Sequence, residues 1–134
     1  CFRQRSAYKS GCGDWARGVN MTDVFVFGSN LAGRHGKGAA LFARQHHGAI
    51  YGQGEGHQGN SYAIPTKDER LQVRTLGQIG QSVFAFKRFA ASRPDLTFNV
   101  TPVGCGLAGY PQDVMKALFE PLPPNCRYSP EWTI

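Results

Sequence analysis

The stretch that most constrains this chain is a short apolar run that ends in a glycine-rich turn, at residues 24–41. Residues 24–27 are all β-branched or aromatic, which predicts a buried strand over about 24–28. Four glycines follow, and the next residues predict a helix over about 36–47. Such a turn is a common anion site, because the first N–H groups of a helix have no partner within it. We expect this loop to bind the phosphates of a nucleotide-like ligand.

A second unit of the same kind lies nearer the C-terminus. Residues 96–103 predict a strand, residues 104–110 form another glycine-rich loop, and residues 112–119 predict a helix that begins after Pro111. In sheets built from such units, ligands bind beyond the carboxyl ends of the strands. Both loops should therefore flank one crevice at the same edge of the sheet.

The remaining pattern interleaves further strands and helices. Apolar residues recur every three or four positions over 75–92, which predicts a helix that ends at Arg93-Pro94. Further strands are predicted at 49–51, at 60–66 with Pro65 near its end, and at about 126–128. Alternating elements of this kind predict an α/β fold, here a three-layer sandwich around a mainly parallel or mixed sheet.

The composition predicts a single domain at 21–134. The chain has 134 residues, of which 41% are hydrophobic and 18% charged, values typical of a globular protein. No apolar run approaches the ~20 residues that a membrane span needs. Residues 1–20 show no helix or strand period, and Met21 resembles a natural start. They are either a segment outside the native protein or a native extension that packs Phe2 or Trp15 on the domain.

We expect a cytoplasmic protein with no metal and no cofactor. The net charge is +6, and half of it lies in residues 1–20, which either bind nucleic acid or are simply solvated. Four cysteines, at positions 1, 12, 105 and 126, lack metal-type spacing and are expected to be free thiols, with a disulfide between the first two left open. His46 and His47 are adjacent, so on a helix their side chains diverge and form no ligand pair.

Two familiar phosphate-binding patterns are excluded by their context. Gly54-x-Gly56-x-x-Gly59 matches a dinucleotide fingerprint, but a strand follows it where a helix should begin. Gly28 and Gly33 have the spacing of a P-loop, yet Arg34-His35 follows instead of lysine and a hydroxyl residue. The chain is therefore not expected to be a nucleoside triphosphatase.

The two loops together resemble the ligand loops of macro domains. Gly28-Ser29-Asn30 followed by Gly36-x-Gly38-Ala39-Ala40 is similar to the first loop, and 104–110 (GCGLAGY) is similar to the second. The likeness covers about 21–120 and is close to a short branch common in phages and bacteria. The acidic residue that holds adenine in many macro domains has no clear equivalent, since Asp23 lies at the start of the first strand.

This resemblance implies binding of ADP-ribose or a derivative, free or carried by a modified protein or nucleic acid. It also implies a hydrolase that removes a group from the distal ribose, as in ADP-ribose-1″-phosphate processing or de-ADP-ribosylation. A non-catalytic reader of ADP-ribose is the alternative. We assign catalysis to Asn30 and His35, and ligand binding to Gly28, Ser29, Asn30, Leu31, Gly33, Gly36, Gly38, Ala39, Gly104, Cys105, Gly106, Leu107, Ala108, Gly109 and Tyr110.

Several of these residues admit a second interpretation. The Asn30 amide can bond ribose hydroxyls or can cap its own loop. His35 can activate a water or can be an exposed loop residue. Tyr110 can cover a sugar or base, or can pack in the core.

Three further residues carry weaker indications of chemistry. Cys105 fits a small buried group better than a nucleophile, because no histidine neighbours it in sequence. Glu55 and His57 lie in the glycine-rich loop 52–59, where either acid–base chemistry or ordinary loop polarity explains them.

Overall fold

The computed structural model describes residues 22–106 and 108–133, so the predicted extension at 1–20 lies outside the described part. The elements are β2 (Asp23–Asn30), α1 (Gly38–His46), β3 (Gly56–Gln58), β4 (Ser61–Lys67), α2 (Leu76–Ala91), β5 (Thr97–Val100), α3 (Gln112–Phe119) and β6 (Cys126–Tyr128). Both predicted strand–loop–helix units are present, as β2–α1 and β5–α3.

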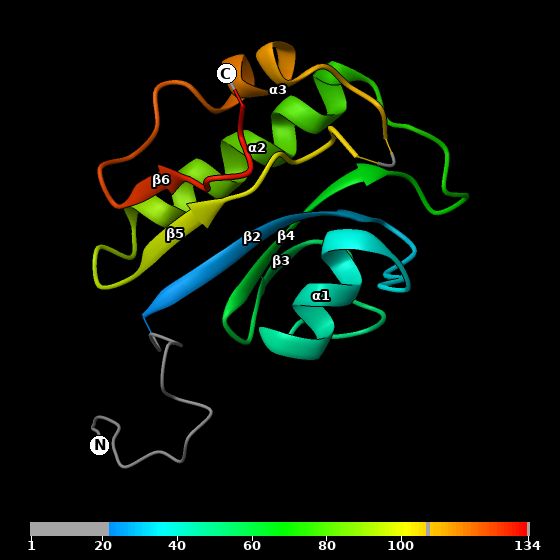
Figure 1. Ribbon diagram of the computed structural model, residues 1–134, viewed down its shortest axis with the longest axis horizontal. Helices are drawn as coiled ribbons and strands as arrows, with labels where there is room; N and C mark the ends of the chain where they lie inside the picture. Colours follow the sequence, from blue (N-terminus) through cyan, green and yellow to red (C-terminus); the bar gives the residue numbers. More distant parts are fainter. Residues whose placement is uncertain (1–21, 107, 134) are drawn as a thin grey trace.

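The described strands form one five-stranded sheet in the order β3-β4-β2-β5-β6 (Figure 1). β2 lies at its centre and pairs in parallel with β4 and β5, while β6 continues in parallel beyond β5. Only the hairpin partner β3 runs antiparallel. Because β2, β4 and β5 run the same way, the three loops that follow them emerge at one edge.

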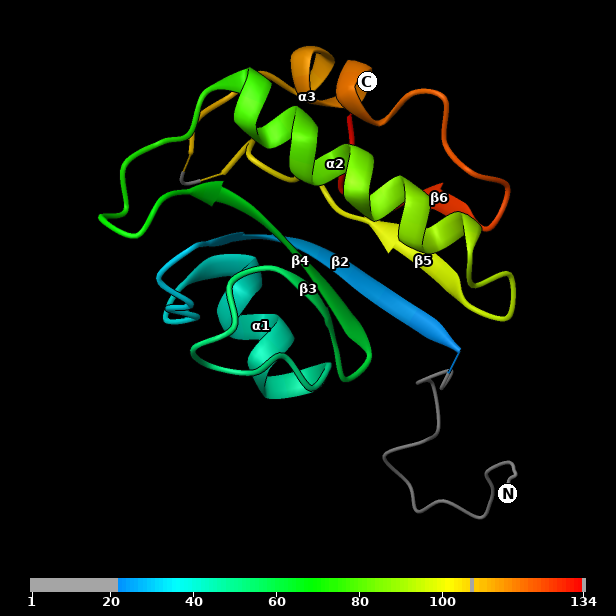
Figure 2. The same ribbon diagram turned by 180° about the vertical axis from the view of Figure 1, so that it is seen from behind.

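Helices cover both faces of this sheet, which gives three layers. α1 lies on one face, whereas α2 and α3 lie together on the other, as the front and back views agree (Figure 2). Two apolar clusters fill the interfaces: a small one with Phe27, Ala40 and Ala43 beneath α1, and a larger one with Phe86 and Phe98 beneath α2. The predicted three-layer α/β fold with a mixed sheet is confirmed.

α2 begins with a capping motif and buries one regular apolar face, so its position could be predicted from the sequence. Thr75 accepts a hydrogen bond from the Gln78 N–H, and the Gln78 side chain accepts one from the Thr75 N–H, which is a complete capping box. Ile79, Val83 and Phe86 recur on one side and are fully buried against the sheet. The observed bounds lie within one residue of the predicted ones.

Two predictions about the middle of the chain are wrong. Residues 49–51 form a loop and not a strand, because the N–H groups of Ala49 and Ile50 bond to Ala43 O and to the Gln58 side chain. The strand β3 lies instead inside the predicted loop 52–59. The strand predicted at 60–66 is observed as β4, which continues two residues past Pro65 to Lys67 and has a register shift at Ser29–Asn30 of β2.

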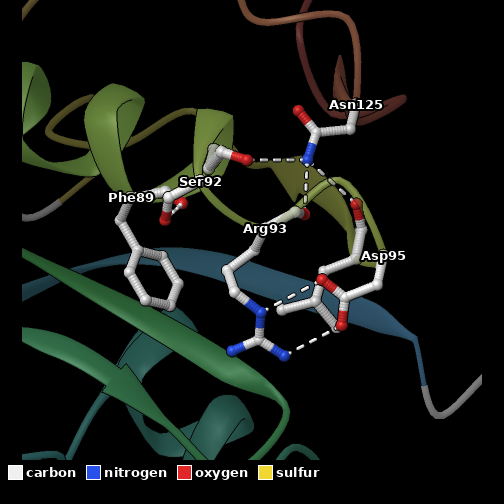
Figure 3. A network of polar contacts seen from close by, with 7 residues as sticks. Phe89, Ser92, Arg93, Asp95 and Asn125 are labelled. Atoms are coloured by element: carbon white, nitrogen blue, oxygen red, sulfur yellow. Dashed lines mark hydrogen bonds and ion pairs between the residues drawn. The ribbon is translucent and has the colours of Figure 1, made fainter.

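The turn from α2 to β5 is held by Asn125, which precedes β6 (Figure 3). Its amide nitrogen donates to the carbonyls of Ala90, Arg93 and Leu96 at 2.9, 2.9 and 3.0 Å. Beside it, Arg93 and Asp95 form a bidentate ion pair at 3.0 and 2.9 Å. One side chain thus joins the end of α2, the following turn and the edge strand.

Candidate site at the carboxyl edge of the sheet

A cavity of about 790 Å³ opens where β2, β4 and β5 end. Its described lining comes from four places in the chain: the end of β2 and the start of α1, Tyr51 after α1, the end of β4, and the segment after β5. The lining residues are Gly28, Ser29, Asn30, Arg34, Gly36, Lys37, Gly38, Ala39, Ala40, Tyr51, Thr66, Lys67, Leu71, Thr101, Pro102, Gly104, Gly106 and Ala108. The two glycine-rich loops therefore share one hollow, as the strand directions predict.

Close backbone contact brings these loops together. A Cβ atom added to Gly28 would lie 3.3 Å from the Gly104 nitrogen. Gly104 itself has φ +78, and a Cβ there would lie 2.9 Å from the Met115 Cε atom. Glycine is favoured at Gly104 by its left-handed backbone, and a Cβ there would also require the end of the Met115 side chain to shift.

The N-terminus of α1 faces the cavity without a capping side chain. The helix begins at Gly38, and Lys37 at the N-cap position forms no side-chain cap. Gly38, Ala39 and Ala40 all line the cavity, so the first-turn N–H groups lie at its wall. Such groups carry partial positive charge and favour an anion.

The charged lining is entirely basic among the described residues. Arg34, Lys37 and Lys67 line the cavity, and no aspartate or glutamate does. None of the three side chains forms an ion pair or hydrogen bond with another described residue. Asp23, the acidic residue considered from the sequence, begins β2 and lies 3.6 Å from Arg127, away from this edge. The cavity thus suits a polyanion.

The side chain of Asn30 closes its own loop. Its Nδ2 atom donates to Arg34 O at 2.9 Å, and its Oδ1 atom accepts from the Arg34 N–H at 2.9 Å. These two bonds support the interpretation that Asn30 caps its own loop. They also set the direction of the segment that carries Arg34. Asn30 still lines the cavity, with one amide proton and one lone pair left for a ligand.

His35 lies behind the cavity wall. The residue is fully buried, its Nε2 atom is 3.0 Å from Gln53 O, and its ring meets Phe27 edge-on at 5.5 Å. Because a carbonyl only accepts, Nε2 carries the proton, and the buried Nδ1 atom has no partner among the described residues. His35 is not part of the cavity lining, so its placement favours packing over contact with a ligand.

The glycine-rich loop at 104–110 contributes backbone to the cavity, while the residues Cys105 and Tyr110 lie outside the lining. Gly104, Gly106 and Ala108 line the cavity. The Tyr110 hydroxyl donates to Arg74 O at 2.6 Å, and the residue packs against the larger apolar cluster. Cys105 is a half-buried free thiol whose pKa is raised by burial, and it is not in the lining. Tyr110 therefore ties this loop to the segment after β4.

The structure brings nine of the sequence-assigned residues into the lining: Gly28, Ser29, Asn30, Gly36, Gly38, Ala39, Gly104, Gly106 and Ala108. Leu31, Gly33, His35, Cys105, Gly109 and Tyr110 lie outside it, and Leu107 lies outside the described residues. The sequence did not assign the other nine lining residues, which are Arg34, Lys37, Ala40, Tyr51, Thr66, Lys67, Leu71, Thr101 and Pro102. Lys67 and Leu71 have only a positional signal, since Lys67 ends β4 and Leu71 follows it, and β4 is one of the parallel strands that end at this edge.

Other groups considered from the sequence do not join the cavity. Glu55, which precedes β3, and His57, within it, are exposed and are absent from the lining. Within residues 22–106 and 108–133, no cluster of three or more histidine, cysteine, aspartate or glutamate residues could hold a metal ion. The helices in that same part of the chain are all too short or too polar to cross a bilayer.

Sheet order, layers and an edge cavity of this kind define a macro-domain-like fold. A solved structure, the macrodomain of Mycobacterium tuberculosis DarG, superposes with a TM-score of 0.60 at 20% identity, covering 88% of this chain and 92% of that one. The fold expected from the two loop motifs is thereby shown. Neither a protein-family model nor a curated protein matches the chain.

Proposed function

We propose that this domain binds ADP-ribose, free or attached to a larger molecule, in the cavity at the carboxyl edge of the sheet. One observation carries the proposal. An uncapped helix N-terminus, a second glycine-rich loop and three cations with no ion-pair partner among the described residues all line the same cavity. A diphosphate needs donors on several sides, and backbone N–H groups supply them at fixed positions. The macro-domain-like fold supports the same ligand class.

The diphosphate and the ribose hydroxyls of the ligand each have matching groups in the cavity. The backbone of Gly104, Gly106 and Ala108 and the first turn of α1 would face the diphosphate. The remaining amide proton of Asn30 and the hydroxyl of Thr66 would meet ribose hydroxyls. Arg34 and Lys67 add long-range attraction, which is screened by salt because Arg34 is exposed and Lys67 only half-buried.

Titration calorimetry with ADP-ribose tests this proposal. Lys67→Glu reverses a lining charge and should weaken ADP-ribose binding by about tenfold, since charge pairs of this kind are typically worth 1–2 kcal/mol. Arg88→Glu is the matched control, because Arg88 is an exposed basic residue of α2 outside the lining. Equal weakening in both variants, or no binding by the native chain, would contradict the proposal.

Hydrolysis at the distal ribose is the second candidate, and the number of cations favours it. A diphosphate with two ester links carries two negative charges at neutral pH, whereas three unpaired cations line the cavity. The third would offset part of the charge of a further phosphate, such as that of ADP-ribose-1″-phosphate. Water attack on this phosphate gives ADP-ribose and inorganic phosphate, and the cations would stabilise the charge that develops.

Phosphate release from ADP-ribose-1″-phosphate separates the hydrolase from the reader. We expect release by the native chain and loss of release in Lys37→Ala, with ADP-ribose still bound. De-ADP-ribosylation is assayed in parallel on a modified protein. Tight ADP-ribose binding without turnover of either substrate would leave only the reader. Membership of the short phage and bacterial type, and a cytoplasmic location, stay predictions from the sequence.

A further inference from the structure

Arg74 comes shortly after β4 in the chain and fixes the end of that strand. Its Nη1 atom donates to Pro65 O at 2.8 Å and to Ser82 Oγ at 3.0 Å, which joins β4 to α2. Its backbone N–H donates to Thr66 O at 2.9 Å, and Thr66 lines the cavity. Because a guanidinium carries its donors in a rigid planar fork, it holds these acceptors in fixed positions. Arg74 thus anchors one part of the cavity wall, although it is not itself in the described lining.

The segment between β4 and Arg74 is closed at its base. Lys67, the last residue of β4, pairs with Val73 in an isolated antiparallel bridge. The bond from the Arg74 N–H to Thr66 O continues this pairing by one residue on each side. Lys67 lines the cavity, so the closed segment forms part of the wall. Arg74 therefore lies at the base of a wall segment whose two ends are held together.

The glycine-rich loop at 104–110 is attached to this base by Tyr110. The Tyr110 hydroxyl donates to Arg74 O at 2.6 Å, and this bond joins residues 36 apart in the sequence. The Tyr110 N–H donates to Gly104 O at 2.8 Å, so the same residue also closes the loop. Gly104 lies close to the end of β4, because a Cβ added to it would lie 3.4 Å from Thr66 Cγ2. The Tyr110 hydroxyl thus links the two wall segments.

We propose that Tyr110 is a positioning residue: its hydroxyl, bonded to Arg74 O, holds the loop at 104–110 in the arrangement that binds the diphosphate, an inference that rests on the proposed function. Backbone donors bind an anion tightly when they are already arranged for it, because ordering them on binding costs free energy. When only a fraction of the molecules has the loop so arranged, the apparent dissociation constant rises in inverse proportion to that fraction. The hydroxyl therefore acts on affinity without touching the ligand.

Two variants that each delete one hydrogen bond at Arg74 test this role. Tyr110→Phe keeps the ring and removes the bond to the loop, whereas Ser82→Ala, the matched control, removes the bond to α2 and leaves Arg74 bonded to Pro65 and Thr66. In calorimetric titration with ADP-ribose, we expect Tyr110→Phe to weaken binding about fivefold and Ser82→Ala to stay within about twofold of the native chain.

Amide hydrogen exchange in the ligand-free chain gives the second readout. The N–H groups of Gly109 and of position 110 bond within the loop, to Gly106 O and Gly104 O, so their exchange reports its opening. Exchange at both should be about fivefold faster in Tyr110→Phe and within about twofold of native in Ser82→Ala.

Three results would overturn the positioning role while the proposed function stands. Native affinity in Tyr110→Phe would show that the bond does not matter for binding. Weaker binding with unchanged exchange would show that the hydroxyl contacts the ligand directly. Equal weakening in Ser82→Ala would assign the effect to general stability. Failure of the native chain to bind ADP-ribose would overturn the proposed function and this role with it.

Discussion

At the scale of single residues, Asn30 ends β2 and His35 follows it in the sequence, but the two residues lie in different places relative to the cavity. Asn30 keeps a place in the cavity lining, but its amide already bonds to the Arg34 backbone in both directions. His35 is buried behind the wall, with one ring nitrogen bonded to Gln53 O. Asn30 therefore shapes a loop at the cavity, and His35 packs behind that loop.

Replacing Asn30 by alanine should open this loop. Both bonds to Arg34 are lost, so we expect ADP-ribose affinity to fall about tenfold while the free energy of unfolding falls by about 1 kcal/mol, because each bond is solvent-exposed. Asn30→Asp keeps the acceptor for the Arg34 N–H and should hold the loop better than alanine. Calorimetry and urea denaturation measure the two effects. An Asn30→Ala variant with native affinity would contradict this role.

Replacing His35 by alanine should act mainly on stability. The change leaves a cavity beside Phe27 and removes the bond to Gln53, and a loss of about 2–4 kcal/mol follows for a fully buried ring. His35→Gln retains a donor and should restore part of that loss. If His35→Gln folds normally yet loses all turnover of ADP-ribose-1″-phosphate, His35 acts in catalysis as the sequence motif suggested.

At the scale of elements, the regular helices and parallel strands were predictable and the segments between α1 and β4 were not. α2 and α3 follow from apolar periodicity and from capping signals at Thr75 and Pro111. β3 was missed because GHQ carries no strand propensity and exists only through pairing with β4. The site was predictable in part. Its glycine-rich loops are visible in the sequence, whereas Tyr51 and Leu71 reach the cavity through tertiary packing.

The corner held by Asn125 gives a test at this scale. Asn125→Asp replaces a donor by a carboxylate that faces the carbonyls of Ala90, Arg93 and Leu96, so acceptor would meet acceptor (Figure 3). We expect a loss of about 2–4 kcal/mol in the free energy of unfolding, and a smaller loss for Asn125→Ala. Urea denaturation measures both. An aspartate variant as stable as the native chain would show that this corner is dispensable.

At the scale of the whole molecule, stability should fall in mild acid. Burial lowers the pKa of His47 and of His57, and the nearby His46 and Arg93 respectively add to the effect. The unfolded chain therefore binds more protons than the folded one, and the free energy of unfolding decreases as the pH falls from about 7 through the folded pKa values. His47 is only partly buried and His57 is exposed, so the effect is modest.

Denaturation at a series of pH values between about 5 and 8 tests this dependence. His47→Phe keeps the ring that stacks on Phe25 at 4.5 Å and removes the titrating group, so it should flatten part of the slope and leave stability at pH 8 nearly unchanged. His46→Phe removes only the neighbouring charge that adds to the shift of the His47 pKa, so it should flatten the slope less than His47→Phe. A slope that is identical in the native chain and in His47→Phe would assign the acid sensitivity to other groups.

The central claim is that backbone amides from two glycine-rich loops hold one ligand at the carboxyl edge of the sheet. Nitrogen-15 NMR during an ADP-ribose titration tests it most directly. The amide signals of Gly36, Gly38, Gly104, Gly106 and Ala108 should shift together and saturate, while those of Gly77 and Gly80 in α2 stay in place. No shift at the loops, or shifts confined to α2, would contradict the claim.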